Sequence, residues 1–283
     1  MARKALTVAG NDVTGGAGQA ADLKMFEEYG VFGATVLTCI VTFHGEEGFA
    51  KDFRHAIEFL DTDLIARQLD SALSVHDFDV IKSGMLGSAE SALLLAERLR
   101  DRRGRAGSLP FVFDPVLVSK GTGTMVDLGD LFVKHLVPLA TVITPNLDEA
   151  AALTGADALH TPQEMAEAAR AIHAMGAANV VVKGGARLDG AEALDVFYDG
   201  HEATVLASTK VNNDLVNGAG CSFASAIAAG VATGLPVDRA VFTAKEKVAH
   251  GIARALDNAT GVRSLYQAAG RCEPDERISV RRL

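Results

Sequence analysis

The sequence predicts an α/β fold in which a mostly parallel sheet is flanked by helices. Short apolar runs with strand-like composition alternate with helical patterns, and glycine-rich or polar turns follow most of these runs. At 283 residues, 48% of them hydrophobic, the chain is long enough to bury a large core. This alternation is typical of a parallel sheet with helices on its faces.

The expected strands recur along most of the chain. They are residues 6–9, 35–41, 80–82, 111–113, 142–144 and 180–182. Two further apolar runs, 193–198 and 203–206, flank the pair Asp199-Gly200, which is typical of a tight hairpin turn. We therefore expect a hairpin after the last parallel strand.

The expected helices cover residues 20–29, 63–74, 90–103, 162–175, 222–234 and 237–256. The strongest start signal is Thr161-Pro162-Gln163-Glu164, which combines a capping residue, a proline at the first helical position and a glutamate three residues after the cap. No repeat, low-complexity tract or linker interrupts the pattern, so we expect residues 1–283 to form a single domain. The charged tail from Gly270 to Leu283 is expected to be loosely held.

The composition argues against several classes of protein. The formal net charge is -9 and no run is rich in lysine and arginine, so neither nucleic acid nor an anionic membrane is an expected partner. No apolar run approaches a membrane span, and residues 1–4 lead directly into the first strand, so we expect a cytoplasmic protein. The 3 cysteines, Cys39, Cys221 and Cys272, lack metal-like spacing and predict neither a disulfide framework nor a zinc site.

A glycine-flanked helix start, Val216 to Ser222, is the feature around which we interpret the chain. Gly218 and Gly220 let backbone N–H groups converge on one point, at the positive end of the following helix, so we expect this segment to bind phosphoryl oxygens. The same surroundings predict a lowered pKa for the Cys221 thiol, which then accepts a proton from a substrate hydroxyl. Considered alone, the segment is more typical of a structural helix start with a small buried cysteine.

Ligands of open α/β sheets bind beyond the carboxyl ends of the strands, so the residues after each strand are the next candidates. The glycine-rich stretch Gly10 to Gly18 follows the first strand and contains Asp12, a side chain suited to a polar ring substituent or the reacting hydroxyl. Asp114-Pro115-Val116 follows the fourth strand, and residues 119–123 after it are expected to form a flap.

Two further turns carry groups suited to a nucleotide and a metal. Asn146 and Glu149 follow the fifth strand at a helix start, where hydrated Mg²⁺ or phosphate oxygens are suitable ligands, although an N-capping cluster explains this pair equally well. Lys183-Gly184-Gly185 follows the sixth strand and places a cation beside flexible backbone, as a triphosphate requires.

Taken in order, these motifs resemble those of a known family. They are Gly15-Gly16-Ala17-Gly18 with Ala21-Asp22-Leu23-Lys24, Lys82-Ser83-Gly84-Met85-Leu86, Asp114-Pro115-Val116, Thr144-Pro145-Asn146-Leu147, Lys183-Gly184-Gly185 and Gly218-Ala219-Gly220-Cys221. The chain resembles the hydroxymethylpyrimidine kinase and pyridoxal kinase branch of the ribokinase-like superfamily from residue 6 to about 255. The resemblance implies a ribokinase-like three-layer sandwich and an ATP- and Mg²⁺-dependent transfer of the γ-phosphoryl group to a hydroxymethyl group on an aza-aromatic ring.

The resemblance also implies roles for individual residues. Cys221 is the implied catalytic base, and the amides of Gly218, Ala219, Gly220 and Cys221 are the implied anion hole. Asn146, Lys183, Gly184, Gly185, Asp195, Gly220 and Lys245 are implied neighbours of ATP, with Glu149 near Mg²⁺. Asp12, Ala17, Phe43, His55, Met85, Val116 and Ser119 are the implied lining of the ring pocket. Phosphoryl transfer depends on positioning and charge neutralisation, which these residue types supply. We also expect the protein to form a homodimer.

Phe43 favours the pyridoxal kinases within this branch. Pyrimidine kinases of thiamine synthesis usually carry Ala-Gln-Asn after the second strand, and Phe43 stands where their glutamine binds the aminopyrimidine. A phenyl ring makes no such hydrogen bonds, and losing one in a buried site costs about 1–3 kcal/mol. His55 falls at the lid histidine of the pyridoxal kinases, and residues 193–200 resemble their hairpin.

Other features depart from the family pattern. Ser119 stands where some pyridoxal kinases carry a second cysteine, Gly45 to Asp52 is longer than usual, and Gln19 is displaced by one position. A hydroxymethylpyrimidine or hydroxymethylpyrimidine-phosphate kinase is the alternative on the same fold. A dinucleotide-dependent dehydrogenase lacks support because Gly15-Gly16-Ala17-Gly18 does not have the required glycine spacing. A non-catalytic vitamin sensor does not need Cys221, Lys183 and Asn146 together.

Overall fold

The computed structural model describes residues 2–45, 54–106, 109–117, 128–211, 215–271 and 278–283. Its strands are β1 (Lys4–Asp12), β2 (Phe32–His44), β3 (Arg54–Phe59), β4 (Val80–Ser83), β5 (Phe111–Phe113), β6 (Val142–Ile143), β7 (Val180–Gly185), β8 (Glu192–Tyr198), β9 (Ala203–Thr209) and β10 (Ser279–Arg282). Its helices are α1 (Gly18–Glu28), α3 (Thr62–Val75), α4 (Ala89–Ala106), α5 (Gly129–His135), α6 (Leu147–Thr154), α7 (Pro162–Ala174), α8 (Ala219–Ala232) and α9 (Val237–Ala253), with 3-10 turns η1 (Val137–Leu139) and η2 (Gln267–Arg271).

The strands of the described residues form a 10-stranded sheet in the order β10-β9-β8-β7-β6-β5-β4-β1-β2-β3. The middle of the sheet, from β7 to β2, pairs in parallel. At one edge β8, β9 and β10 are antiparallel to their neighbours, and at the other edge β3 is antiparallel to β2. The predicted mostly parallel α/β sheet is therefore confirmed, with antiparallel additions at both edges.

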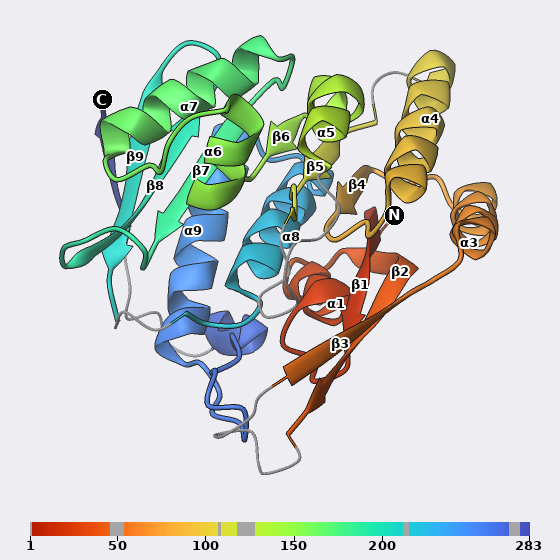
Figure 1. Cartoon of the computed structure of the whole chain (residues 1–283), viewed down its shortest axis with the longest axis horizontal. Coiled ribbons are helices and arrows are strands. Elements are labelled where there is room, and N and C mark those ends of the chain that lie inside the picture. Colours follow the sequence, from red (N-terminus) through yellow and green to blue (C-terminus); the bar gives the residue numbers. More distant parts are fainter. Residues whose placement is uncertain (1, 46–53, 107–108, 118–127, 212–214, 272–277) are drawn as a thin grey trace.

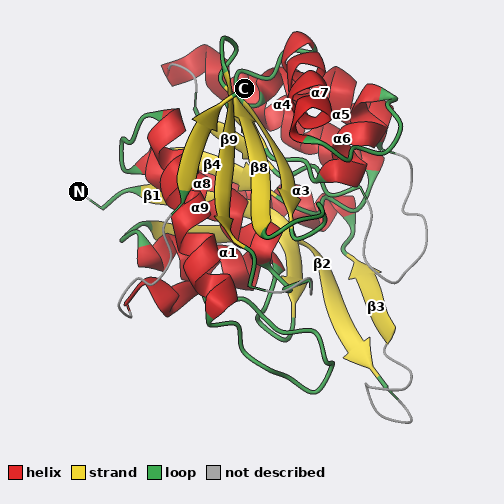
Figure 2. Ribbon diagram, turned by 90° about the vertical axis from the view of Figure 1, so that its left-hand side faces the viewer, coloured by secondary structure: helices red, strands yellow, loops and turns green. Residues whose placement is uncertain are grey.

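Helices cover the two faces of the sheet as separate layers (Figure 1, Figure 2). Helices α3 to α7 pack on one face, and α1, α8 and α9 pack on the other. Alternate residues of the buried strands supply the two cores, because successive side chains point to opposite faces. In β5, for example, Phe111 and Phe113 belong to the first core, whereas Val112 belongs to the second. This is the predicted three-layer sandwich.

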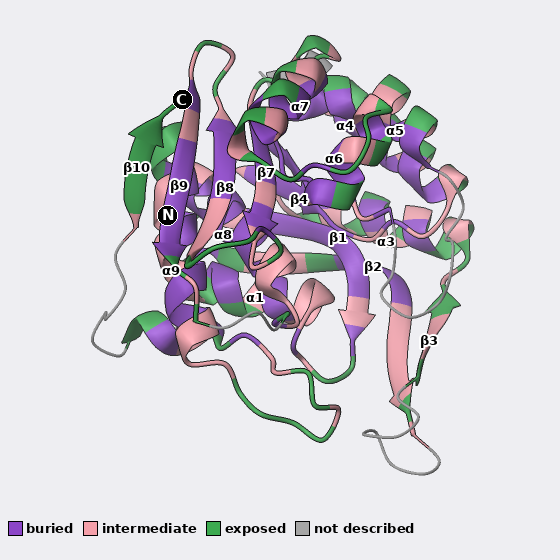
Figure 3. Ribbon diagram, turned by 60° about the vertical axis from the view of Figure 1, so that its left-hand side comes forward, coloured by how far each residue is buried: buried purple, intermediate pink, exposed green. Residues whose placement is uncertain are grey.

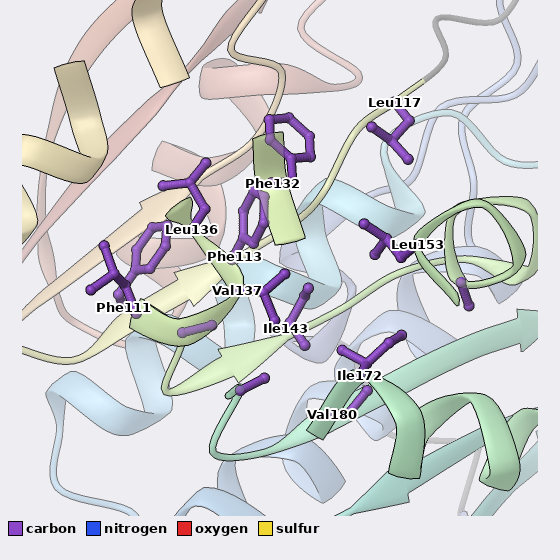
Figure 4. Packing of buried hydrophobic residues seen from close by; sticks show 14 of the residues in the cluster. Phe111, Phe113, Leu117, Phe132, Leu136, Val137, Ile143, Leu153, Ile172 and Val180 are labelled. Atoms are coloured by element: carbon purple, nitrogen blue, oxygen red, sulfur yellow. The ribbon is translucent and has the colours of Figure 1, made fainter. Parts of the chain in front are cut away.

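Aromatic side chains centre the larger core on β5 (Figure 4). The rings of Phe111 and Phe113 stack with centroids 5.7 Å apart, and Phe132 of α5 meets Phe113 edge-on at 5.1 Å. Leu136, the C-cap residue of α5, is fully buried in the same cluster. Such packing fixes the short strand β5 and therefore the turn that follows it, which carries Asp114.

The structure also contains elements that the sequence did not predict. Strand β2 extends to His44, three residues beyond the predicted end at Val41, because it pairs with the unpredicted strand β3. Helix α5 was not predicted. The tail was expected to be loosely held, but its residues 279–282 form β10, which pairs with β9 at an exposed edge of the sheet (Figure 3).

Candidate active site

A cavity of about 460 Å³ lies where the carboxyl ends of the parallel strands meet the start of α8. Every described residue that the resemblance assigned to the site lines this cavity: Asp12, Ala17, Phe43, His55, Met85, Val116, Asn146, Glu149, Lys183, Gly184, Gly185, Asp195, Gly218, Ala219, Gly220, Cys221 and Lys245. Ser119, Cys272 and the segment 46–53 lie outside the described residues. The sequence therefore identified a set of residues that the fold brings together.

The start of α8 has the open geometry expected of an anion site. Gly218 is the N-cap, with a φ of 81°, and neither a side-chain cap nor an acidic residue is present in the first turn. A Cβ at Gly218 would lie 1.7 Å from the carbonyl oxygen of Gly16, so only glycine fits. A Cβ at Gly220 would lie 3.3 Å from Nζ of Lys183, so an ammonium group flanks the helix start. Backbone amides, the helix dipole and this ammonium group together suit phosphoryl oxygens.

Cys221 is half-buried in the first turn of α8 and is not in a disulfide. Burial raises the pKa of its thiol, the Lys82 ammonium lowers it, and the carboxylates of Asp22 and Asp114 raise it, while a hydrogen bond from the Gly18 backbone lowers it. The net pKa lies above the ordinary value. The predicted lowering of the Cys221 pKa was therefore wrong, because burial outweighs the favourable groups at the helix start.

Lys183 forms an ion pair that the sequence did not predict. Its Nζ lies 2.7 Å from Oδ1 of Asp114, the residue after β5, and Thr144 donates to the same oxygen at 3.1 Å. Burial lowers the pKa of Lys183, but Asp114 and Glu149 raise it more, so the net pKa lies above its usual value. The sequence did contain a signal for this pair, because Asp114 and Lys183 both lie near the carboxyl ends of predicted parallel strands.

Asn146 and Glu149 form a capping box at the start of α6. Glu149 N–H donates to Oδ1 of Asn146 at 3.0 Å, and Asn146 N–H donates to Oε2 of Glu149 at 2.8 Å. Burial raises the pKa of Glu149, Lys183 lowers it, Asp114 raises it, and the resulting pKa is about 7. The capping alternative is therefore confirmed. Both residues also line the cavity, and their role toward Mg²⁺ or phosphate oxygens stays a prediction.

Asp195 and Lys245 meet on the opposite wall. Nζ of Lys245, from α9, donates to Oδ2 of Asp195 at 2.8 Å and to the carbonyl of Ala193 at 3.0 Å. The N–H of Gly185 donates to Oδ1 of Asp195 at 3.1 Å. This ties the turn after β7 to the hairpin and to α9.

Asp12 is held by partners from two distant parts of the chain. Its carboxylate accepts hydrogen bonds from Thr14, from the Ala17 N–H at 3.1 Å and from Asn217 Nδ2 at 2.9 Å. The sequence analysis missed the role of Asn217, which immediately precedes the helix start. Asn217 thus connects the end of β1 to the start of α8.

Phe43 and His55 form part of the cavity wall from adjacent strands. They face each other in the β2–β3 pairing, with ring centroids 6.0 Å apart and planes inclined by 60°. Burial lowers the pKa of His55, whereas the Asp12 carboxylate raises it, with a net lowering. A neutral imidazole and a phenyl ring make this wall suitable for a flat aromatic substrate.

The residues present fit a nucleoside triphosphate and a hydrated magnesium ion. The glycine cradle of α8 beside Lys183 suits the phosphates. Among the described residues no cluster of three or more His, Cys, Asp or Glu side chains could hold a metal, but Mg²⁺ usually needs only one or two carboxylates with water and phosphate. Glu149 and Asp114 both line the cavity near Lys183 and are the candidate carboxylates for such an ion. None of the described helices is both long and apolar enough to cross a membrane.

Comparison with known proteins gives the same picture. The chain is 41% identical over 251 residues to the pyridoxine kinase of Bacillus subtilis, which covers 88% of this chain and 90% of that protein. It is 39% identical over 247 residues to the hydroxymethylpyrimidine/phosphomethylpyrimidine kinase of Rhizobium meliloti, with 87% and 88% covered. The structure of the pyridoxal kinase from Staphylococcus aureus in complex with AMP-PCP and pyridoxal matches with a TM-score of 0.91, at 34% identity and with 100% of both chains covered.

The family model described as phosphomethylpyrimidine kinase matches residues 12–265. This range includes the cavity residues from Asp12 to Lys245, and the solved structure has the ribokinase-like fold. The chain therefore belongs to the phosphomethylpyrimidine kinase family, a family of kinases with the ribokinase-like fold.

Proposed function

We propose that the protein transfers the γ-phosphoryl group of ATP to the 5′-hydroxymethyl group of pyridoxal, pyridoxine and pyridoxamine, in vitamin B6 salvage. The observation that carries the proposal is one cavity that joins an aromatic wall, Phe43 with His55, to the glycine-flanked start of α8 at Cys221. The similarity to a pyridoxine kinase and to a pyridoxal kinase structure supports it.

The chain's own residues divide the work between two sides of the cavity. Asp12, held by Asn217 and the Ala17 amide, accepts a hydrogen bond from a polar group on the ring. The ring lies against Phe43, while Met85 and Val116 complete an apolar lining. The hydroxymethyl group then points toward Cys221.

The thiolate form of Cys221 accepts the hydroxyl proton, the substrate oxygen forms a bond to the γ-phosphorus, and the bond from phosphorus to the bridging oxygen breaks as ADP leaves. The amides of Gly218 to Cys221 and the ammonium group of Lys183 would hold the transferred phosphoryl group and neutralise its charge, and Glu149 would hold the hydrated metal. Magnesium, when bound, would offset the negative charge of the phosphate oxygens. Asn146, Asp195 and Lys245 shape the nucleotide side of the cavity.

The alternative is a hydroxymethylpyrimidine or hydroxymethylpyrimidine-phosphate kinase of thiamine biosynthesis. The matching family model and the Rhizobium meliloti relative favour it. Phe43 argues against it, because a phenyl ring offers no hydrogen bond to an exocyclic amine.

A coupled assay with ATP and Mg²⁺ tests the function. The substrates are pyridoxal, pyridoxine, pyridoxamine and hydroxymethylpyrimidine, each varied alone at saturating ATP. We expect turnover of the pyridines with the higher kcat/KM and loss of turnover when Mg²⁺ is chelated. No turnover of any of the four contradicts the proposal, and a higher kcat/KM for hydroxymethylpyrimidine selects the alternative.

We further propose that residues 1–283 form one domain, that two copies form a homodimer and that the protein works in the cytoplasm. The continuous sheet from β3 to β10 supports the single domain. Sedimentation equilibrium tests the homodimer, and a monomer mass contradicts it.

A further inference from the structure

A buried ion pair lies behind the thiol of Cys221. Nζ of Lys82 donates to both carboxylate oxygens of Asp22, each at 2.9 Å, and neither side chain is exposed to solvent. Thr7 Oγ1 donates to the same carboxylate at 2.5 Å and Ser225 Oγ donates at 2.6 Å. The carboxylate of Asp22 is therefore held by three side chains, from β1, β4 and α8.

Two packed helices place this pair one turn below the thiol. Helix α1 packs against α8. Gly18 and Asp22 of α1 are four positions apart, as are Cys221 and Ser225 of α8, so each pair shares one face of its helix. Gly18 and Cys221 meet through a hydrogen bond from the Gly18 amide to the Cys221 sulfur atom. Asp22 and Ser225 meet where Ser225 donates to Asp22. One helical turn rises about 5.4 Å, so the ion pair is close to the sulfur atom without occupying the reacting position.

Stability alone gives little reason to keep an ion pair there. Removing two charges from water costs free energy that their attraction only partly returns, and apolar replacements of such pairs are often neutral or stabilising. Lys82 nevertheless stands in β4 between buried residues and lines the floor of the cavity. Burial lowers its pKa, but Asp22, Cys221 and Asp114 raise it, and the resulting pKa of about 12 keeps it charged at neutral pH.

The charged groups that act on the thiol come from each element around it. Lys82 of β4 favours the thiolate most strongly, whereas Asp22 of α1 and Asp114 after β5 oppose it. Lys183 of β7 also interacts with the thiol. Of these groups, Asp114 and Lys183 are paired with each other and face the phosphate side. The Lys82–Asp22 pair is instead hydrogen-bonded to Thr7 and Ser225.

We propose that Lys82 and Asp22 are positioning residues that set the balance between thiol and thiolate at Cys221, with Lys82 stabilising the thiolate and Asp22 limiting that effect. The proposal rests on the proposed role of Cys221 as the base. In the reaction the S–H bond forms as the substrate O–H bond breaks, the substrate oxygen forms a bond to the γ-phosphorus, and the bond from phosphorus to the bridging oxygen breaks so that ADP leaves. Lys82 keeps all its protons and transfers none.

The test is the pH dependence of alkylation of Cys221 by iodoacetamide in the free full-length protein. Peptide-resolved mass spectrometry follows this thiol separately from Cys39 and Cys272. Lys82→Met is expected to move the midpoint of the rate upward by about one pH unit, and Asp22→Asn to move it downward. The alkaline change in kcat against pH should move in the same directions.

The double variant Lys82→Met/Asp22→Asn keeps the test decisive if a single variant fails to fold, because it leaves no unpaired buried charge. Because Lys82 affects the Cys221 thiol more strongly than Asp22 does, the alkylation midpoint of the double variant should lie above that of the wild type and below that of Lys82→Met. A midpoint unchanged within about 0.3 unit in the variants that fold overturns the proposal.

Thr7→Val is the matched control, because it removes a hydrogen bond to Asp22 without changing a charge. Its midpoint should equal that of the wild type. A shift as large as that of Lys82→Met would mean that packing, and not charge, determines the thiol–thiolate equilibrium of Cys221. That result also overturns the proposal. The alkylation readout needs no substrate, so a wrong substrate assignment shows in the coupled assay alone and leaves this result standing.

Discussion

At the scale of single residues, Cys221 carries the chemistry proposed for the site. It stands in the first turn of α8, beside amides that no side chain caps, and it lines the same cavity as the phosphate-side groups. We predict that Cys221→Ala lowers kcat by about 10²- to 10⁴-fold, because a general base commonly contributes that much. Nucleotide affinity, measured by titration with ADP, should change little. Turnover within about twofold of the wild type is incompatible with Cys221 as the base.

Phe43 is expected to set the choice of ring. The variant Phe43→Gln introduces an amide that can bind an exocyclic amine, so the ratio of kcat/KM should move toward hydroxymethylpyrimidine and away from pyridoxine by about ten-fold. Phe32→Gln is the matched control, since it makes the same change on β2 at a residue that is 49% exposed and does not line the cavity. If both variants shift the ratio equally, contact between Phe43 and the ring is not the cause.

The sequence correctly predicted where Cys221 lies, but the predicted direction of its pKa shift was wrong. The motif around Cys221 indicated where the thiol lies, because glycine spacing and helix direction are local properties of the chain. Its raised pKa depends on burial and on Lys82, Asp22 and Asp114, which reach it from three other elements. A lysine inside the apolar run of β4 was the available signal for this network.

At the scale of elements, the proposed nucleotide side and the proposed vitamin side of the cavity lie at the ends of different strands. Lys183 lies near the end of β7, beside Gly220 at the start of α8, and Glu149 lies in the first turn of α6. Lys183→Ala should raise KM for ATP, and Glu149→Gln should raise the Mg²⁺ concentration needed for half-maximal rate, with KM for pyridoxine nearly unchanged. Steady-state kinetics with each component varied separately measures both effects. An increase confined to KM for the vitamin means that the two sides are reversed.

The helix start itself is tested by its capping glycine. Gly218→Ala must adopt a φ of 81° and also clash with the carbonyl of Gly16, so we expect it to lower the free energy of unfolding by about 3 kcal/mol and to abolish most turnover. Gly155→Ala at the end of α6 has a φ of 67° and nothing within 4 Å, so it isolates the backbone cost of about 1–2 kcal/mol. Urea unfolding compares the two. Equal losses would show that the contact with Gly16 contributes nothing.

Prediction of elements was most accurate where the signal was local. The capping box at Thr161 and Glu164 and the Asp199-Gly200 hairpin both appear as predicted. Strand β3 escaped prediction because residues 54–59, Arg-His-Ala-Ile-Glu-Phe, show no regular alternation of polar and apolar side chains, and only pairing with β2 makes them a strand. Strand β10 was missed for the same reason, since its exposed residues are ordered by pairing with β9.

At the scale of the whole molecule, the sheet order brings the ends of the chain to one site. Asp12 and Asn217 are hydrogen-bonded although 205 positions separate them, because β1 lies in the middle of the sheet and α8 packs against its neighbours. Motif order predicted that these segments share a site. It did not predict the contacts between them, because side-chain partners depend on helix packing that no single stretch of sequence encodes.

The central claim is that this cavity phosphorylates a pyridine vitamin in preference to an aminopyrimidine. Internal competition tests it most directly: pyridoxine and hydroxymethylpyrimidine are mixed at equal concentration with ATP and Mg²⁺, and the two phosphorylated products are quantified by mass spectrometry early in the reaction. The product ratio equals the ratio of the two kcat/KM values. We predict about a ten-fold excess of pyridoxine phosphate, from the aromatic contact with Phe43 and the missing amide. An excess of hydroxymethylpyrimidine phosphate contradicts the account of the ring pocket.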